Sequence, residues 1–523
     1  MQKPYARKLL LATVFATGTA VLILEVLAVR ILSPQFGTSM FVISSVLTVV
    51  LAALALGYYW GGQVADQHPS PLPLYTIIAA GGFMIALSFA LAKFIVPFAG
   101  SILPITFGPL FLSLMLFFVP AFLLGTDSPY VIKLLTTQGS PDTAGTTTGT
   151  VFFWSTIGSI VGSLSAGFFF IPFVGLEITL LGVACFLAVG AGLAAWYLGE
   201  ETTGSPLRIR AVFTIAIVTI ILSGITLHSP RPHAYPKEQK TLYEADHQYG
   251  HIRVYEQDFS LTRPPARFLK REVNSESAIF QDSYHHPFVY ARFSDLFPEL
   301  RRSTTTNFLL LGGGAYSIAR SILAAHPTIT TDVAELEPAL FPLAVKYFDL
   351  GNLDRLTNHV VDARVFVENA GQRYDYIFMD TFNSGLYIPA HLTTIEFFTS
   401  LRSRLTDDGL LMINFIGAEQ LPDTNLLDSF TKTLHTVFPN ARAFSEQPNL
   451  QGKLKNIIFI ADATDQEIDV TDVAVSLAAD KPGTPLTELE LSLTPVDPDA
   501  QIIFTDDRSP AEYLVAKQIS ATQ

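Results

Sequence analysis

The residues best suited to chemistry follow a short apolar run near the middle of the chain. Four apolar residues, Phe308 to Leu311, are typical of a strand buried on both faces, and Gly312, Gly313 and Gly314 come directly after them. Glycines at this point permit a tight turn and the close approach of a ligand to the backbone. A helix-compatible run begins at Ile318, so the stretch predicts a strand, loop and helix unit that holds a nucleotide-like molecule.

Three carboxylates are predicted to lie at the same edge of a parallel sheet. Glu335 ends the next apolar run, about 20 residues beyond the loop, where a carboxylate can accept hydrogen bonds from ribose hydroxyls. Asp362 and Asp380 follow the next two predicted strands, and ligands bind at the carboxyl ends of such strands. Asp362 could equally cap the helix that begins at Ala363, whereas Asp380 could act as a base or orient a nucleophile.

An alternation of strands and helices must position these groups, and the sequence provides one from Asn307 onward. Strands are predicted at Phe308–Leu311, Thr330–Leu336, His359–Val361, Tyr374–Met379, Leu410–Phe415 and Ile457–Ala461. Helices are predicted at Tyr316–Ala325, Pro338–Tyr347, Arg364–Ala370, Thr394–Leu405 and Asn425–Val437. This pattern indicates an α/β doubly wound domain. Before it, a small antiparallel β segment is predicted from runs at Tyr249–Tyr255, Phe268–Val273 and Ser277–Phe280.

The N-terminal part is apolar enough to form a multi-span α-helical membrane domain in a lipid bilayer, with about seven transmembrane helices. The predicted spans are Leu9–Leu32, Phe41–Trp60, Leu74–Phe98, Ile105–Leu124, Gly149–Pro172, Leu176–Leu198 and Ala211–Leu227. Lysines and arginines precede the first predicted span and follow the fourth and the sixth. The positive-inside rule therefore predicts that the N-terminus is cytoplasmic, and we expect the chain to lie in the inner membrane of the cell. An odd number of spans then places the C-terminal half outside the cytoplasm.

Ionisable residues within or beside the spans are candidates for a transport function. We expect Arg30 and Lys93 to extend toward the membrane surface and Glu25 to contact Arg30. Asp66 and Asp127 are predicted to lie in cytoplasmic loops beside glycines. We therefore interpret these charged residues as part of the packing of the helices. A transport function stays open as an alternative.

Composition and length predict five segments. Residues 1–228 form the membrane domain, 229–241 a linker, 242–300 the small β segment, 301–463 the α/β domain, and 464–523 an acidic segment that ends in a strand and a helix. The net charge of −13 argues against a nucleic-acid partner. The single cysteine, Cys185, excludes an intramolecular disulfide. No metal is predicted, because the adjacent His285 and His286 are poorly spaced to ligate one ion.

The ligand of the glycine loop is better predicted as an adenosyl sulfonium compound than as NAD. The dinucleotide fingerprint requires a third glycine where this chain has Ser317. The third and fourth predicted strands are also followed by carboxylates, Asp362 and Asp380, which an NAD site does not require.

At these residues the chain, from about Leu242 to Gly417, resembles spermidine synthases, the polyamine aminopropyltransferases. It is most similar to relatives in which several membrane spans precede the synthase-like domain. The matching stretches are Leu310–Gly314, Val333–Glu337, Val361–Arg364, Tyr374–Asp380, Pro389–Leu392 and Glu396–Phe398. The resemblance implies a class I methyltransferase-like Rossmann fold, a small amine or polyamine substrate, and a homodimer. It also implies S-adenosylmethionine or decarboxylated S-adenosylmethionine as co-substrate.

The resemblance also implies residue roles. Gly312–Gly314 would bind the nucleoside together with Glu335 at the ribose, and Asp362 with Ala363 would bind the adenine. Asp380 would deprotonate or orient the attacking amine, and Tyr284 lies at the family's conserved tyrosine position.

Three departures from the family pattern bear on the reaction. The family's loop aspartate, which holds the aminopropyl ammonium, is Ala315 here, its second catalytic-loop aspartate is Asn383, and a usual glutamine is Gly250. Without those carboxylates, methyl or other alkyl transfer from intact S-adenosylmethionine becomes the alternative reaction. A sensor or carrier that binds a nucleoside or polyamine without turnover is the alternative from another class.

A late acidic pair could restore the missing charge. Asp506 and Asp507 follow a strand-like run and are candidates for the amine site, or else for a turn before Pro510.

Overall fold

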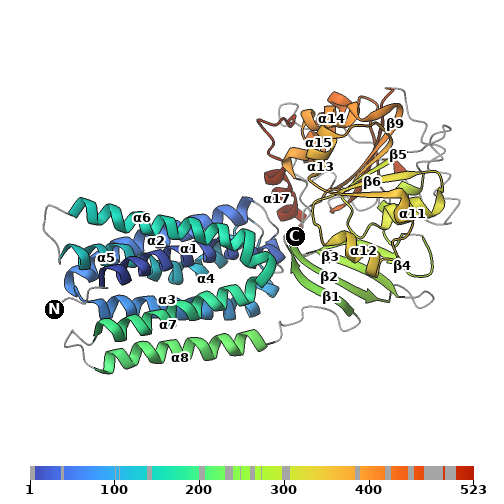
Figure 1. The fold of residues 1–523 in the computed structure, drawn as a ribbon. Helices are drawn as coiled ribbons and strands as arrows, with labels where there is room; N and C mark the ends of the chain where they lie inside the picture. The colour runs from blue at the N-terminus through green and yellow to red at the C-terminus, as the bar shows by residue number, and fades with distance from the viewer. Residues whose placement is uncertain are drawn as a thin grey trace. The chain divides into compact units, whose positions relative to one another are not determined.

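The computed structural model describes most of the chain as two compact units, residues 1–234 and 235–523 (Figure 1). The residues described are 6–36, 40–99, 102–104, 106–137, 144–199, 206–229, 239–247, 249–258, 265–271, 274–284, 286–296, 307–382, 389–418, 426–445, 453–464, 487–488 and 502–522. Asn383, residues 465–486 and residues 489–501 lie outside them.

The first unit is a bundle of long helices. Its elements are α1 (Ala6–Phe36), α2 (Met40–Gln67), α3 (Pro71–Ala99), α4 (Gly108–Gly125), α5 (Asp127–Thr136), α6 (Ala144–Ser165), the π-helical η2 (Ala166–Val174), α7 (Leu176–Gly199) and α8 (Pro206–His228). Among the residues described, seven helical stretches are long and apolar enough to cross a membrane, with α4 and α5 together forming one of them. This finding confirms the predicted number of spans.

Glycines allow α1 and α6 to approach each other closely. A Cβ atom at Gly158 would lie 2.1 Å from the main-chain oxygen of Phe15, and one at Gly162 would lie 2.3 Å from that of Thr19. The Thr19 hydroxyl donates to the main-chain oxygen of Gly158 at 2.9 Å. Small residues at such a crossing let two apolar helices pack backbone to backbone, which is how helices associate in a bilayer.

Two predictions about charged residues in this unit were wrong. Lys93 does not extend to a surface: it is 7% exposed, donates to the main-chain oxygen of Thr226 at 2.9 Å, and pairs with Glu177 at 3.5 Å. Asp127 does not lie in a loop but begins α5, where it is 1% exposed and accepts a hydrogen bond from Thr17 at 2.5 Å. A neighbouring helix supplies a polar partner in each case, and a single chain segment cannot reveal such a partner.

The second unit opens with a four-stranded antiparallel sheet in the order β1-β2-β3-β4. Its strands are β1 (Lys240–His247), β2 (Gly250–Gln257), β3 (Ala266–Arg271) and β4 (Asn274–Phe280). The sequence predicted three strands and assigned the start of β1 to the linker. β1 is an edge strand with largely exposed or half-exposed side chains, so it lacks the apolar alternation that marks a buried strand.

The large sheet has eight strands in the order β12-β10-β11-β9-β8-β5-β6-β7. The run from β9 to β7 is parallel, while β11 is antiparallel to β9. The strands are β5 (Asn307–Leu311), β6 (Thr330–Glu335), β7 (Leu356–Val360), β8 (Tyr374–Met379), β9 (Leu405–Gly417), β10 (Arg442–Ser445), β11 (Lys455–Asp462) and β12 (Thr487–Glu488). This order confirms the predicted class I methyltransferase-like Rossmann fold.

Helices cover both faces of the large sheet. Figure 1 shows α13, α14 and α15 gathered on one side, and α11 and α12 on the side of the small sheet. The bounds are α9 (Val289–Arg292), η3 (Phe293–Leu296), α11 (Ser317–Ala325), α12 (Leu340–Tyr347), η4 (Leu353–Arg355), α13 (Ala363–Asn369), η5 (Ala390–Leu392), α14 (Ile395–Ser403), α15 (Leu426–Val437) and α17 (Ala511–Thr522). The residues of β5 from Phe308 to Leu311 are at most 1% exposed, as expected of a central strand between two helical layers.

The α1–α6 contact yields a prediction about membrane-unit stability. Gly158→Ala would force a methyl group against the α1 backbone, so we expect a loss of about 1–3 kcal/mol, the usual cost of overpacking. Gly149→Ala, on the same helix, is the matched control, because a Cβ atom there meets nothing within 4 Å. Thermal unfolding of both variants in one detergent measures the difference. Equal midpoints for Gly158→Ala and Gly149→Ala would contradict the described packing.

Candidate active site

The glycine loop lies where the strand order of the parallel sheet reverses. β5 continues to β6 on one side and neighbours β8 on the other, and the crevice at such a switch point is where this fold binds ligands. Gly312 has φ +89°, and a Cβ atom there would lie 2.3 Å from the main-chain oxygen of Asp380. The turn after β5 therefore packs directly against the turn after β8, and a larger residue at Gly312 would separate them.

Glu335, the last residue of β6, holds this loop in place. One carboxylate oxygen accepts from the main-chain N–H groups of Gly313 at 2.7 Å and Gly314 at 3.3 Å. The other oxygen accepts from the N–H of Glu337 at 2.8 Å. Glu335 is 5% exposed, so the amide donors compensate for the cost of burying its charge. The structure thus brings Glu335 and the glycine loop together, as the sequence predicted.

Asp362 is the N-cap of α13. Its Oδ1 accepts from the main-chain N–H groups of Arg364 at 2.9 Å and Val365 at 3.2 Å, and its Oδ2 lies 3.1 Å from Nε2 of His391. The hydrogen bond to His391 is the largest of several contacts that lower the pKa of Asp362. Ala363 begins α13 and is buried beside it. The capping interpretation of Asp362 therefore holds, and it leaves the carboxylate at the carboxyl edge of the sheet.

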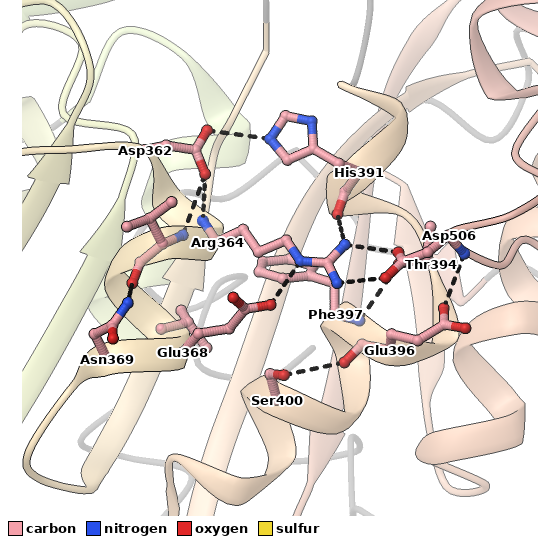
Figure 2. A network of polar contacts seen from close by, with 12 residues as sticks. Asp362, Arg364, Glu368, Asn369, His391, Thr394, Glu396, Phe397, Ser400 and Asp506 are labelled. Atoms are coloured by element: carbon pink, nitrogen blue, oxygen red, sulfur yellow. Dashed lines mark hydrogen bonds and ion pairs between the residues drawn. The ribbon is translucent and has the colours of Figure 1, made fainter.

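Arg364 joins this edge to the C-terminal segment (Figure 2). Its guanidinium forms a two-pronged ion pair with Asp506, with both N–O distances at 2.6 Å, and it also bonds Glu368 at 2.7 Å. Thr394 donates to Asp506 at 2.8 Å, and the N–H of Asp506 donates to Glu396 at 3.1 Å. Asp506 is thus committed to Arg364, and these contacts anchor the residues before α17 to the start of α14.

Asp380 follows β8 and is held by a neighbouring strand. The amide nitrogen of Asn414, on β9, donates to Asp380 Oδ1 at 2.9 Å. Burial raises the pKa of Asp380 to about 6, and the nearby Glu335 adds to the rise, whereas the hydrogen bond from Asn414 and the neighbouring Tyr290 hydroxyl oppose it. A carboxyl group with such a pKa is ionised at neutral pH yet basic enough to accept a proton.

A tyrosine that the sequence analysis did not single out, Tyr290, lies beside Asp380. Tyr290 lies on the short helix α9, is 9% exposed, and donates to the main-chain oxygen of Glu276 at 2.9 Å. Tyr284 is 54% exposed, and its ring stacks against Arg320, with the guanidinium carbon 4.4 Å from the ring centroid. No bond from Tyr284 to Asp380 occurs among the described residues, and the role predicted for it gains no support.

A buried ion pair completes the site, and sequence analysis overlooked it. Arg271, at the end of β3, donates from Nε to Glu276 of β4 at 2.7 Å and from its NH2 nitrogen to the main-chain oxygen of Phe382 at 3.2 Å. Burial raises the pKa of Glu276 to about 7; Arg271 opposes the rise, whereas Glu335 and Asp380 add to it. The small sheet thus contributes charged groups to the crevice. The pairing of β3 with β4, which a sequence alone does not reveal, brings Arg271 and Glu276 together.

The remaining predicted residues are placed as follows. Ala315 is 2% exposed and belongs to the apolar core beneath the loop, while Asp507 is exposed. The role predicted for Asn383 concerns a residue outside the described part of the chain. Within the described residues, no group of three His, Cys, Asp or Glu side chains is arranged to hold a metal ion.

The chain is similar to polyamine aminopropyltransferases. It is 31% identical to one from Vibrio vulnificus over 191 residues, which covers 36% of this chain and 60% of that protein. Polyamine aminopropyltransferase 1 of Streptomyces coelicolor is 24% identical over 82% of this chain and 80% of its own. That share exceeds the second unit, so the similarity extends into the apolar helices. These matches agree with the resemblance found in the sequence.

The chain is also similar to part of a methyltransferase and to a solved spermidine synthase structure. An N-terminal histidine N-methyltransferase of Emericella nidulans is 34% identical over 28% of this chain and 26% of that protein. The chain thus spans 60% of the length of the Vibrio vulnificus protein and 26% of that of the Emericella nidulans protein. A probable spermidine synthase structure from Corynebacterium glutamicum overlaps with a TM-score of 0.40 at 22% identity, covering 47% of this chain and 89% of that one. No protein-family model matches the chain.

The ion pair in Figure 2 yields a prediction about the C-terminal segment. Asp506→Asn removes the charge that Arg364 binds, and because Asp506 is 40% exposed we expect a loss of no more than about 1 kcal/mol in global stability. Local release of α17 should be the larger effect, seen as faster proteolysis near the C-terminus. Asp507→Asn is the control, since Asp507 is an exposed neighbour. Equal proteolysis rates in the two variants would contradict the anchoring function of Asp506.

Proposed function

We propose that this chain is a membrane-bound transferase that moves an aminopropyl group from decarboxylated S-adenosylmethionine to an amine. One observation carries the proposal: the glycine loop, Glu335, Asp380 and Glu276 converge on the crevice between β5 and β8. Carboxylates in excess of the single guanidinium of Arg271 favour a cationic ligand. The similarity to polyamine aminopropyltransferases supports the same class of reaction.

Each residue would act through its own chemistry. Glu335 would accept hydrogen bonds from the ribose hydroxyls while it keeps Gly313 in place, and Asp362 would accept one from the adenine amino group. Gly312 and Gly314 would let the ligand approach the backbone. These assignments fit the hydrogen-bond acceptors that the site presents, since each carboxylate lies at the carboxyl end of a strand.

Asp380 would hold the acceptor amine and take its proton. The amine nitrogen forms a bond to the methylene carbon next to the sulfonium, while the electron pair of the carbon–sulfur bond moves to sulfur. The products are the extended amine, neutral methylthioadenosine, and a proton received by Asp380. Alignment of the amine with the carbon–sulfur bond and removal of its proton are the two requirements of this displacement, so no further catalytic group is needed.

Methyl transfer from intact S-adenosylmethionine is the second candidate. Ala315 places no carboxylate in the glycine loop, and part of the chain is similar to a histidine N-methyltransferase. The product distinguishes the two reactions, because aminopropyl transfer releases methylthioadenosine and methyl transfer releases S-adenosylhomocysteine. A full-length preparation in detergent is incubated with each donor separately and a mixture of polyamines, and it should release methylthioadenosine from the decarboxylated donor. Release of S-adenosylhomocysteine alone would replace our proposal with methyl transfer.

The function of Asp380 can be tested with one substitution. Asp380→Asn keeps the hydrogen-bonding shape but cannot accept a proton, so we expect turnover to fall by about 10²–10⁴-fold. Asp407→Asn is the control, because Asp407 pairs with Arg373 on the surface with its side chain 96% exposed. Methylthioadenosine release, measured at saturating donor, reports the loss. Turnover in Asp380→Asn equal to that of the control would exclude Asp380 as the base.

The pH profile provides a second test of Asp380. Its pKa is raised to about 6, so the proton-accepting form is present above that pH and is lost below it. The rate should therefore fall on the acid side with a midpoint near 6, and this limb should be missing from the residual activity of Asp380→Asn. A limb that persists in the variant would assign it to another group.

We propose further that the N-terminus is cytoplasmic and that the second unit lies on the opposite side of the cell membrane. Lys3, Arg7 and Lys8, which precede the first predicted span, and the seven candidate spans among the described residues support this orientation. A phosphatase that is active only outside the cytoplasm, fused after the last residue, should be active. A fluorescent reporter that folds only in the cytoplasm should be dark in the same position, and a bright one would overturn the orientation.

A further inference from the structure

Glu276 lies on β4, next to a residue that contacts the glycine loop. The next residue of β4, Ser277, shares a hydrogen bond of 2.9 Å with Ser317 at the start of α11. The side chain of Ser277 also lies nearest to Gly314, 3.5 Å from where a Cβ atom would be. β4 therefore passes directly beside the loop, although it belongs to a different sheet.

The surroundings of Glu276 bring it close to the reacting groups. Its main-chain oxygen accepts the Tyr290 hydroxyl, and the charges of Glu335 and Asp380 both act on its carboxyl group. Its Oε1 is bonded to Arg271, whereas no hydrogen bond to Oε2 occurs within the part of the chain described. One carboxylate oxygen is thus fixed by the protein and the other is available to a ligand.

The local balance of charge selects the kind of ligand. Glu276, Glu335, Glu337 and Asp380 all act electrostatically on this region, and Arg271 is the cation that faces them. Arg271 already donates to Glu276 and to the main-chain oxygen of Phe382, so its charge is largely compensated. The remaining charge is negative, and desolvated negative charge is stabilised by an ammonium group.

We propose that Glu276 binds the ammonium group of the aminopropyl chain of the donor, and that it thereby selects the decarboxylated form. The assignment rests on the proposed function and specifies its substrate recognition. The loop cannot supply this carboxylate itself, because Ala315 is a buried apolar residue. Intact S-adenosylmethionine would bring its own carboxylate toward those of Glu276, Asp380 and Glu335, and the repulsion between them would weaken its binding.

Proton release is the signature of this contact. The pKa of Glu276 is raised to about 7, so the carboxyl group is partly protonated at neutral pH, and an arriving ammonium favours the ionised form. Binding at pH 7 should release roughly half a proton from Glu276. The other groups that face Glu276 change this little: Asp380, with its pKa of about 6, is mostly ionised at pH 7, while Arg271 and Tyr290 keep their protons.

Calorimetry on the full-length protein in detergent tests the assignment. Decarboxylated S-adenosylmethionine is titrated at pH 7 in two buffers of different ionisation enthalpy, and methylthioadenosine, which lacks the aminopropyl group, is titrated in parallel. In Glu276→Gln we expect the affinity for the decarboxylated donor to fall by roughly tenfold or more, with the proton release lost. The affinity for methylthioadenosine should be unchanged, and Glu276→Asp should keep the proton release.

Glu256→Gln is the matched control. Glu256 also pairs with an arginine of the small sheet, Arg267, at 2.8 Å, so its loss breaks an equivalent ion pair. Full affinity for the decarboxylated donor in folded Glu276→Gln would overturn the assignment, as would an equal loss of methylthioadenosine binding. If Glu276→Gln does not fold, the wild type alone still tests the assignment. Binding of the decarboxylated donor to the wild type without proton release would overturn the assignment of Glu276. If the wild type binds neither decarboxylated S-adenosylmethionine nor methylthioadenosine, the proposed function itself is refuted. This outcome is distinguishable from those that overturn only the assignment of Glu276.

Discussion

The position of the Glu335 carboxylate between two turns is the constraint on which the site depends. Its two oxygens accept the N–H groups of Gly313 and Glu337, so the loop after β5 and the turn after β6 share one buried negative charge. A charge at this depth is tolerated because main-chain amides compensate for lost water. The glycine loop is therefore preorganised by the same group that would bind a ribose, and a ligand would find its backbone contacts already formed.

The fold around this constraint was largely predictable because its signals are local. Buried strands such as β5 and β8 appear as short apolar runs, and the order of strands and helices alone indicates a doubly wound sheet. The edges were harder to predict. β1 is half-exposed and β10 is only Arg442–Ser445, so neither carries enough apolar periodicity to be recognised. Tertiary pairing, rather than local preference, makes these segments strands.

Residues at the ends of parallel strands could be predicted, whereas residues brought in from the small sheet could not. Glu335, Asp362 and Asp380 follow strands of one sheet, so their convergence follows from topology. Tyr290, Glu276 and Arg271 come from a hairpin and a short helix whose placement over the loop depends on packing between two sheets. Sequence analysis singled out Tyr284 from its position in the family pattern and did not consider Tyr290, whose place beside Asp380 depends on that packing.

The absence of the family's loop aspartate at Ala315 has a physical explanation in the charges that the small sheet contributes. A carboxylate can be lost from a loop without loss of cation binding when another strand delivers one to the same space, since an ammonium group responds to charge and distance and not to the strand of origin. Ala315 leaves the core beneath the loop apolar, while Arg271 and Glu276 of the small sheet, with side chains 12% and 14% exposed, keep a carboxylate largely desolvated at a tolerable cost. The substrate preference of such a site is thus set by the net charge of the assembled crevice, and the loop motif taken alone is an incomplete guide to it.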